Sequence, residues 1–227
     1  MVAIFQWIER TTKIHVVVQT GAGKFFCTGM ELVDDDATAP MSFALGSDFH
    51  TLNKLLIGSN KMLIAAVNGP AAGYGVTSLA LYDLVYAVPE AYFFTPFTRL
   101  GMAAEGASSL SFPRLMGHQR AATLLLAGDR ISAQDAERFG LISKILPAAD
   151  FVKHVVEIAE RLARSPQGAL RATKGLMRQG VRQELLDAND RECALIQGER
   201  HGSKENRDAV ARFRQERRGK RAAKSQL

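Results

Sequence analysis

The sequence predicts an α/β core followed by a C-terminal segment that contains only helices. Short apolar or β-branched runs alternate with helical patterns up to about residue 148, which is typical of successive βα units. From residue 150 onward the apolar residues recur at helical spacing and no strand-like run interrupts them. A chain of 227 residues suits one large domain or a domain with an appendage, and we divide it into 1–148, 149–218 and a basic tail at 219–227.

The elements are predicted in order from these patterns. The β-branched run from His15 to Thr20 and the apolar run from Met62 to Val67 have the length of buried strands. Further strands are predicted at 84–88, 92–94 and 142–146. Helices are predicted at 2–8, 43–57, from 73 onward, 108–116, 119–127, 132–137, 150–164, 166–180, 184–200 and 203–218. Ser132 followed three residues later by Asp135 predicts an N-terminal capping box.

The core is organised around the turn that follows the strand ending at Val67. Asn68-Gly69-Pro70 predicts a tight turn, and the small and apolar residues from Gly73 onward predict the start of a buried helix. Free backbone N–H groups beside a helix start favour negative charge, either bound or developing during a reaction. On this stretch alone, an ordinary strand–helix connection with glycines for close packing is the favoured interpretation.

Composition and charge exclude several classes of function. The hydrophobic content of 47% and charged content of 23% are those of a globular protein, and no apolar run approaches the ~20 residues that span a bilayer. Cys27 and Cys193 are too few for a disulfide framework, which indicates an intracellular setting. The net charge is +6, but the stretch 212–224 holds seven basic residues and one acid. The remaining 22 basic and 22 acidic residues balance, so nucleic acid binding by the body of the protein is not expected.

No cofactor or metal motif is found. Gly21-Ala-Gly-Lys24 lacks the spacing of a phosphate loop, and Gly73-Tyr-Gly75 lacks the third glycine of a dinucleotide fold. The five histidines are scattered without ligand spacing, at His15, His50, His118, His154 and His201.

Two separated segments together resemble the crotonase (enoyl-CoA hydratase/isomerase) superfamily. Phe25-Phe-Cys-Thr-Gly-Met-Glu-Leu32 is similar to its first oxyanion segment, and Ala65-Ala-Val-Asn-Gly-Pro-Ala-Ala-Gly-Tyr-Gly75 to its second. Three further segments fit in the family's order, at 16–23, 95–109 and 126–141. The resemblance implies a ββα spiral core, here short at its N-terminus, with C-terminal helices that form a homotrimer or a dimer of trimers.

The resemblance also implies an oxyanion hole for a thioester oxygen. Its donors would be the backbone N–H groups of Met30 and Tyr74, which would stabilise charge on that oxygen mainly in the transition state. The residues implied to contact an acyl-coenzyme A substrate are Thr28, Gly29, Met30, Glu31, Leu32 and Gly73.

The position of the base separates the activities of the superfamily. Hydratases resemble one another in using two glutamates, but Thr77 stands at the first of those positions and the second falls near Phe97. Glu105, in Ala104-Glu-Gly-Ala-Ser, instead matches the single glutamate of the peroxisomal-type Δ3,Δ2-enoyl-CoA isomerases. A carboxyl in this apolar, glycine-rich segment should have a raised pKa, which suits a base acting on a carbon acid.

The isomerase prediction therefore assigns Glu105 as the catalytic base and requires no metal or redox cofactor. The alternatives are an enoyl-CoA hydratase and a non-catalytic crotonase-fold protein, the latter with RNA binding through the basic tail. The family has roughly forty more N-terminal residues, so we expect the native product to start upstream of Met1. Ser225-Gln226-Leu227 is similar to a peroxisomal address, which predicts binding to an import receptor and a peroxisome-like location, or a cytoplasmic one if it is not read.

Overall fold

The computed structural model describes residues 1–29 and 42–224, with side chains up to residue 216. A four-stranded parallel sheet has the order β1-β2-β4-β7, and a three-stranded sheet has the order β3-β5-β6. The strands are β1 (Val16–Thr20), β2 (Met62–Val67), β3 (Ala71–Ala72), β4 (Leu84–Ala87), β5 (Tyr92–Phe94), β6 (Ile131–Ser132) and β7 (Lys144–Ile145).

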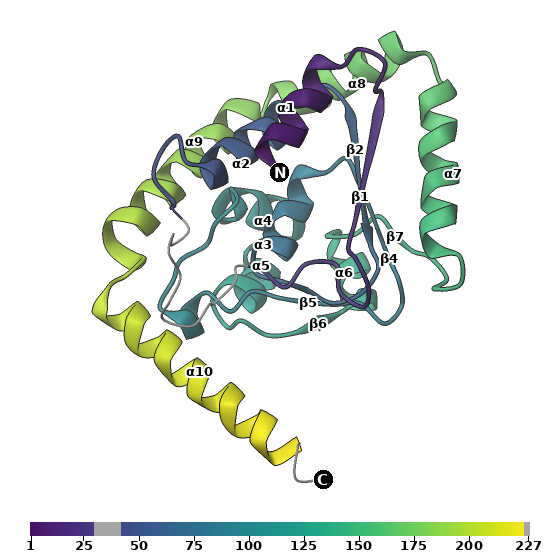
Figure 1. Cartoon of the computed structure of the whole chain (residues 1–227). Coiled ribbons are helices and arrows are strands. Elements are labelled where there is room, and N and C mark those ends of the chain that lie inside the picture. Colours follow the sequence, from purple (N-terminus) through teal and green to yellow (C-terminus); the bar gives the residue numbers. More distant parts are fainter. Residues whose placement is uncertain (30–41, 225–227) are drawn as a thin grey trace.

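Helices cover the sheets on both sides. The α-helices are α1 (Val2–Arg10), α2 (Asp48–Gly58), α3 (Tyr74–Thr77), α4 (Ser108–Met116), α5 (His118–Leu125), α6 (Ala133–Phe139), α7 (Phe151–Arg164), α8 (Gln167–Gln179), α9 (Arg182–Leu195) and α10 (Lys204–Lys224). Short 3-10 turns span Ser78–Leu81 and Thr98–Leu100, and a π turn spans Ile196–Arg200. Figure 1 shows α7 along one side of the parallel sheet, with α1, α2, α3, α4 and α9 on the other, while α10 projects away from the body.

The central strand is β2, as its composition predicts. It pairs in parallel with β1 and with β4, and every one of its residues from Leu63 to Val67 is buried. A strand buried on both faces requires a continuous apolar run, which Met62–Val67 supplies. The turn after β2 therefore starts from the most rigid part of the core.

The second sheet is not predicted by the sequence. β3 and β6 have two residues each, too few to display a strand's period of two. β3 pairs in parallel with β5, and β5 pairs antiparallel with β6. The predicted turn Asn68-Gly69-Pro70 is therefore followed by a short strand immediately before Gly73.

Several predicted helices have different limits in the structure, and three of the differences have a clear meaning. The helix predicted at 43–57 begins only at Asp48, because the Ser47 side chain accepts a hydrogen bond from the backbone N–H of His50. The helix predicted from Gly73 is the single turn α3 and continues as a 3-10 turn. The helix predicted at 203–218 extends to Lys224, since Ala, Arg and Lys favour helix and the predicted tail begins inside α10. The Ser132–Asp135 capping box is confirmed.

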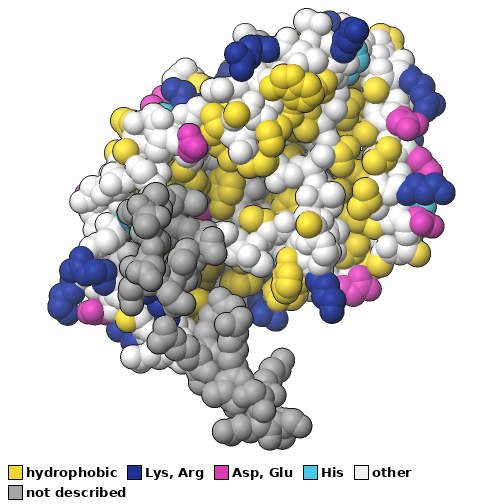
Figure 2. Space-filling model, in the orientation of Figure 1, with side chains coloured by type: hydrophobic (Ala, Val, Ile, Leu, Met, Phe, Trp, Pro, Cys, Tyr) yellow, Lys and Arg dark blue, Asp and Glu magenta, His cyan; other side chains and the backbone are white. Residues whose placement is uncertain are grey.

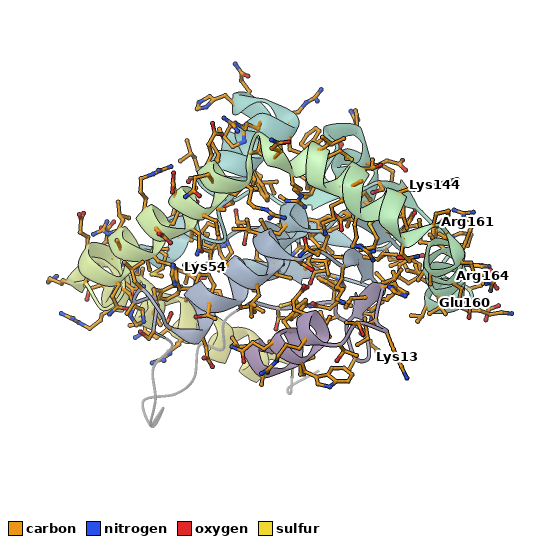
Figure 3. All side chains as sticks on the ribbon, turned by 90° about the horizontal axis from the view of Figure 1, so that it is seen from above. Lys13, Lys54, Lys144, Glu160, Arg161 and Arg164 are labelled. Carbon is orange, nitrogen blue, oxygen red and sulfur yellow. The ribbon has the colours of Figure 1, made fainter. Side chains whose placement is uncertain are left out.

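Helix α7 shows how the C-terminal helices present their polar residues. Its buried residues are Phe151, Val155 and Ala159, on the face toward β1 and β2. Figure 3 shows Glu160, Arg161 and Arg164 at the outer edge of this helix. In the described part of the chain, no helix has the length and apolar character needed to cross a membrane.

Candidate active site

The two predicted oxyanion segments lie side by side. The N–H of Phe26 donates to the carbonyl of Pro70 at 3.1 Å, and the N–H of Ala72 donates to the carbonyl of Cys27 at 2.8 Å. Cys27 and Ala71 also form a parallel bridge. These backbone contacts join residues about 45 positions apart in the sequence, and they place Gly29 beside Gly73.

Glycines allow this close approach. A Cβ at Gly75 would lie 2.7 Å from both Cβ and the carbonyl oxygen of Cys27. A Cβ at Gly29 would lie 3.0 Å from the carbonyl oxygen of Ala72, and Gly29 has φ +80°. Gly73 has φ +54°, in the region that favours glycine. The space between the two segments therefore requires glycine at Gly29 and Gly75, and the backbone conformation favours it at Gly73.

Gly73 directs the chain into α3 and leaves one backbone donor available. Its carbonyl accepts the N–H of Val76 at 2.9 Å and the N–H of Thr77 at 3.1 Å. The N–H of Tyr74, the first residue of the helical turn, has no acceptor among the residues that the structure describes. A backbone donor in this position can bind an anionic oxygen.

The side chain of Tyr74 is fixed by α2 and α9. Its hydroxyl donates to Oδ1 of Asn53 at 2.7 Å, and Nδ2 of Asn53 donates to Oδ1 of Asn189 at 2.8 Å. The ring packs edge-on against Phe49, with centroids 5.1 Å apart. Burial raises the pKa of Tyr74 well above its ordinary value, so the hydroxyl remains a neutral donor. These contacts restrict movement of the backbone at Tyr74.

Glu105 lies beside this turn. Its side chain is buried, and the next residue, Gly106, is close enough to α3 that a Cβ there would meet Oγ1 of Thr77 at 3.1 Å and the ring of Tyr74 at 3.5 Å. Burial raises the pKa of Glu105 from 4.5 to about 8, with a further contribution from the charge of Glu192. The raised pKa expected from the apolar segment is confirmed.

Glu192, the second buried carboxyl at this site, is not predicted from the sequence. Its Oε2 accepts the N–H of Ala107 at 2.6 Å and its Oε1 accepts the N–H of Ser109 at 2.8 Å. Burial raises its pKa to about 7, although these hydrogen bonds lower it. The segment around Glu105 contains no other acid and suggests a lone carboxyl, but Glu192 of α9 is a second carboxyl at the site. The feature of the sequence that could have indicated Glu192 is its position on the buried face of α9.

The structure thus brings together four of the predicted site residues: Gly29, Gly73, Tyr74 and Glu105. Thr28 precedes Gly29 and is exposed. Met30, Glu31 and Leu32 lie outside the described residues, so their predicted roles remain predictions. The described residues contain no group of three or more His, Cys, Asp or Glu side chains arranged to hold a metal ion.

The sequence matches a known family and curated relatives. The model of the enoyl-CoA hydratase/isomerase family matches residues 1–220. Enoyl-CoA delta isomerase 2 of Rattus norvegicus is 35% identical over 185 residues, which are 80% of this chain and 47% of the relative. The Homo sapiens protein of the same name is 36% identical over 203 residues, 87% of this chain and 51% of the relative. The chain spans about half the length of these two relatives.

Solved structures agree with this match. An enoyl-CoA hydratase/isomerase from Pseudoalteromonas atlantica is 30% identical with a TM-score of 0.87, covering 95% of this chain and 84% of that chain. OdaA of Pseudomonas aeruginosa is 31% identical with a TM-score of 0.87, covering 93% of this chain and 85% of that chain. With its two paired segments, its buried glutamates and its mixed α/β fold, the chain belongs to the enoyl-CoA hydratase/isomerase family, within the crotonase superfamily.

Proposed function

We propose that this protein is a Δ3,Δ2-enoyl-CoA isomerase in unsaturated fatty acid β-oxidation, with Glu105 as its base. The observation that carries the proposal is a buried carboxyl with a pKa of about 8, next to a turn where the N–H of Tyr74 has no acceptor among the described residues. A base that must remove a proton from carbon is more effective when its pKa is raised toward the operating pH. The names of the two delta isomerase relatives support the same activity.

In the proposed reaction, one proton moves within the substrate. Ionised Glu105 removes a proton from C2 of a 3-enoyl thioester, and the electron pair delocalises onto the thioester oxygen as a dienolate. The N–H groups of Tyr74 and Met30 would donate to that oxygen. The Glu105 carboxylic acid then returns the proton to C4, which yields the trans-2-enoyl thioester. Atoms and electrons balance without a cofactor, and the thioester is the only substrate.

The alternative is hydratase activity, for which Glu192 is the second carboxyl at the site. Both oxygens of Glu192 already accept a backbone N–H, which leaves this carboxylate less able to bind and activate a water molecule. At the position of the first hydratase glutamate, Thr77 is fully buried and cannot act as a base near neutral pH. These two features favour isomerisation over hydration.

The test is turnover of a 3-enoyl-CoA, followed by the ultraviolet absorbance of the conjugated thioester product. We expect Glu105→Gln to lower kcat by ~10²–10⁴-fold while substrate binding is retained. Glu157→Gln, an exposed change on α7, is the matched control and should leave kcat unchanged. Full activity of Glu105→Gln would refute the assignment of the base. Hydration alone in the wild type would favour the hydratase, and neither turnover nor binding would favour a non-catalytic protein.

We also propose that the chain forms a homotrimer or a dimer of trimers and is imported into a peroxisome-like organelle. The side chains of Trp7, Leu176 and Met177 are 58%, 74% and 77% exposed, which supports contact with other subunits. Figure 2 shows hydrophobic side chains gathered across the middle of one face, with charged side chains mostly at its margin. Ser225–Leu227 lie outside the described residues. Light scattering tests the assembly, and deletion of the last three residues tests the import.

A further inference from the structure

The turn that carries Glu105 is held by a side chain from another helix. Glu192, on α9, is only 7% exposed and accepts two backbone hydrogen bonds, from Ala107 at 2.6 Å and from Ser109 at 2.8 Å. Two N–H donors on one buried carboxylate form a directed, charge-assisted contact. The first of these donors belongs to the second residue after Glu105.

This turn needs an external partner because of its own conformation. Gly106 and Ala107 both have positive φ, +68° and +59°, and a left-handed alanine costs about 1–2 kcal/mol. Ala107 is the N-cap of α4 but has no side chain that can cap the helix. The N–H groups at a helix start usually bond to a Ser, Thr, Asp or Asn at the cap. Glu192 supplies this cap from α9, and so stabilises a backbone that would otherwise be strained and unpaired.

The same contact places a second carboxyl near Glu105. Their mutual repulsion raises the pKa of Glu105 beyond the effect of burial. Glu192 ionises first, because it accepts two N–H groups, and its negative charge then acts on Glu105. The other titratable groups near the two carboxyls are Tyr74 on α3, Cys193 on α9 and the cationic Arg191. Of these, only Arg191 carries positive charge, and it acts on Glu192.

We propose that Glu192 is a positioning residue for the reaction: it holds the backbone of the turn so that Glu105 faces the substrate carbon, and it keeps negative charge beside that carboxyl. The inference rests on the proposed role of Glu105 as the base. Glu192 acts through Glu105 and through the main chain of the turn, and it makes no contact with the reacting atoms. A stronger base at Glu105 is the expected benefit, because repulsion favours its protonated form after proton abstraction.

The experiment compares three variants on α9 by the pH dependence of kcat/KM for a 3-enoyl-CoA. Glu192→Gln keeps the size of the side chain but removes its charge and one acceptor. We expect kcat to fall at least tenfold and the acid limb of the profile, near pH 8 in the wild type, to move to lower pH. Glu192→Asp keeps the charge, so its acid limb should stay near that of the wild type. Its kcat should still fall, because the shorter side chain reaches the N–H groups of the turn less well.

The control is Glu184→Gln, on the same helix, where the half-exposed side chain pairs with Arg114. It should leave both kcat and the pH profile unchanged. A Glu192→Gln enzyme with the wild-type acid limb would overturn the inference, even if the variant were less stable. So would a Glu192→Asp enzyme whose acid limb moved as far as that of Glu192→Gln, because the charge would then not be responsible.

A second readout requires no turnover. Carbon-13 NMR of protein labelled at the glutamate carboxyls follows the titration of Glu105, whose signal is assigned by its loss in Glu105→Gln. The Glu105 titration should move to lower pH in Glu192→Gln, and no movement would overturn the inference. A wild type without isomerase activity would refute the proposed function. A wild type with activity, and a Glu192→Gln variant with an unchanged Glu105 titration, would refute only the positioning role.

Discussion

Replacing the proposed base should make the protein more stable, and the gain should grow with pH. Glu105 is buried and its pKa is raised from 4.5 to about 8 in the folded protein. Between these two values the folded state binds more protons than the unfolded state, so the stability of the wild type falls as the pH rises through this window. Glu105→Gln removes the titrating group and keeps the shape of the side chain. The cost of ionising Glu105 is therefore absent in the variant.

The size of the effect follows from the two pKa values. A difference from 4.5 to about 8, at about 1.4 kcal/mol per pKa unit, makes the ionised form cost about 5 kcal/mol well above pH 8. At about pH 5.5 the wild type has lost only about 1 kcal/mol, and at about pH 8.5 it has lost about 4–5 kcal/mol. We therefore expect the advantage of Glu105→Gln in free energy of unfolding to increase by about 3 kcal/mol between these two pH values.

Urea unfolding of wild type and variant at the two pH values measures this increase. Glu157→Gln, which changes an exposed glutamate on α7, corrects for the general effect of losing one negative charge. A stability difference that is the same at both pH values would refute the reasoning, because it would mean that Glu105 titrates alike in the folded and unfolded protein. The same result would remove the physical basis for assigning Glu105 as a base with raised pKa.

Three further substitutions test the framework of the site. Gly75→Ala should lower kcat at least tenfold and destabilise the fold by about 1–3 kcal/mol, since the new Cβ would lie 2.7 Å from the Cys27 carbonyl oxygen. Wild-type kcat in this variant would contradict the close packing of the two segments. Asp83→Asn should lower the free energy of unfolding in urea by about 3–5 kcal/mol, because the buried Nζ of Lys174 lies 2.6 Å from the Asp83 carboxylate. A loss below about 1 kcal/mol would show that the pair is not buried in solution. Gly175→Ala, at an open and exposed position in α8, should stabilise the protein by up to about 1 kcal/mol without changing kcat, and destabilisation would contradict the helix there.

Much of the core could be predicted from the sequence because its signals are local. Met62–Val67 is a continuous apolar run, and it forms the central strand with the predicted limits. Gly75 is needed by its contact with Cys27 and Gly73 by its positive φ, and these glycines are the first sign of a functional turn in the sequence. The second sheet could not be predicted, because β3 and β6 are too short to carry a periodic pattern and exist only through pairing with β5.

The candidate base could also be located from the sequence, because the segment around Glu105 resembles the one that carries the single glutamate of the isomerases. Its pKa could be expected to rise because this segment is apolar and rich in glycine. The magnitude could not, since it depends partly on a charge that comes from α9, and Ala107 and Glu192 are 85 positions apart in the chain. A local sequence pattern describes the environment that a segment makes for itself, and it does not report which helix will later cover that segment.

Helix α9 shows where this limit lies. Leu185, Ala188, Asn189, Glu192 and Cys193 follow one another at helical spacing, and all of them are buried. A carboxyl on the apolar face of a helix is costly to bury unless it finds donors, so the pattern alone already requires a polar partner for Glu192. The partner is the backbone of the turn after Glu105, because α9 packs against α4. The cost of burying Glu192 is thus tied to the geometry of the proposed base, which explains why a charged residue occupies a position that leucine would fill more favourably.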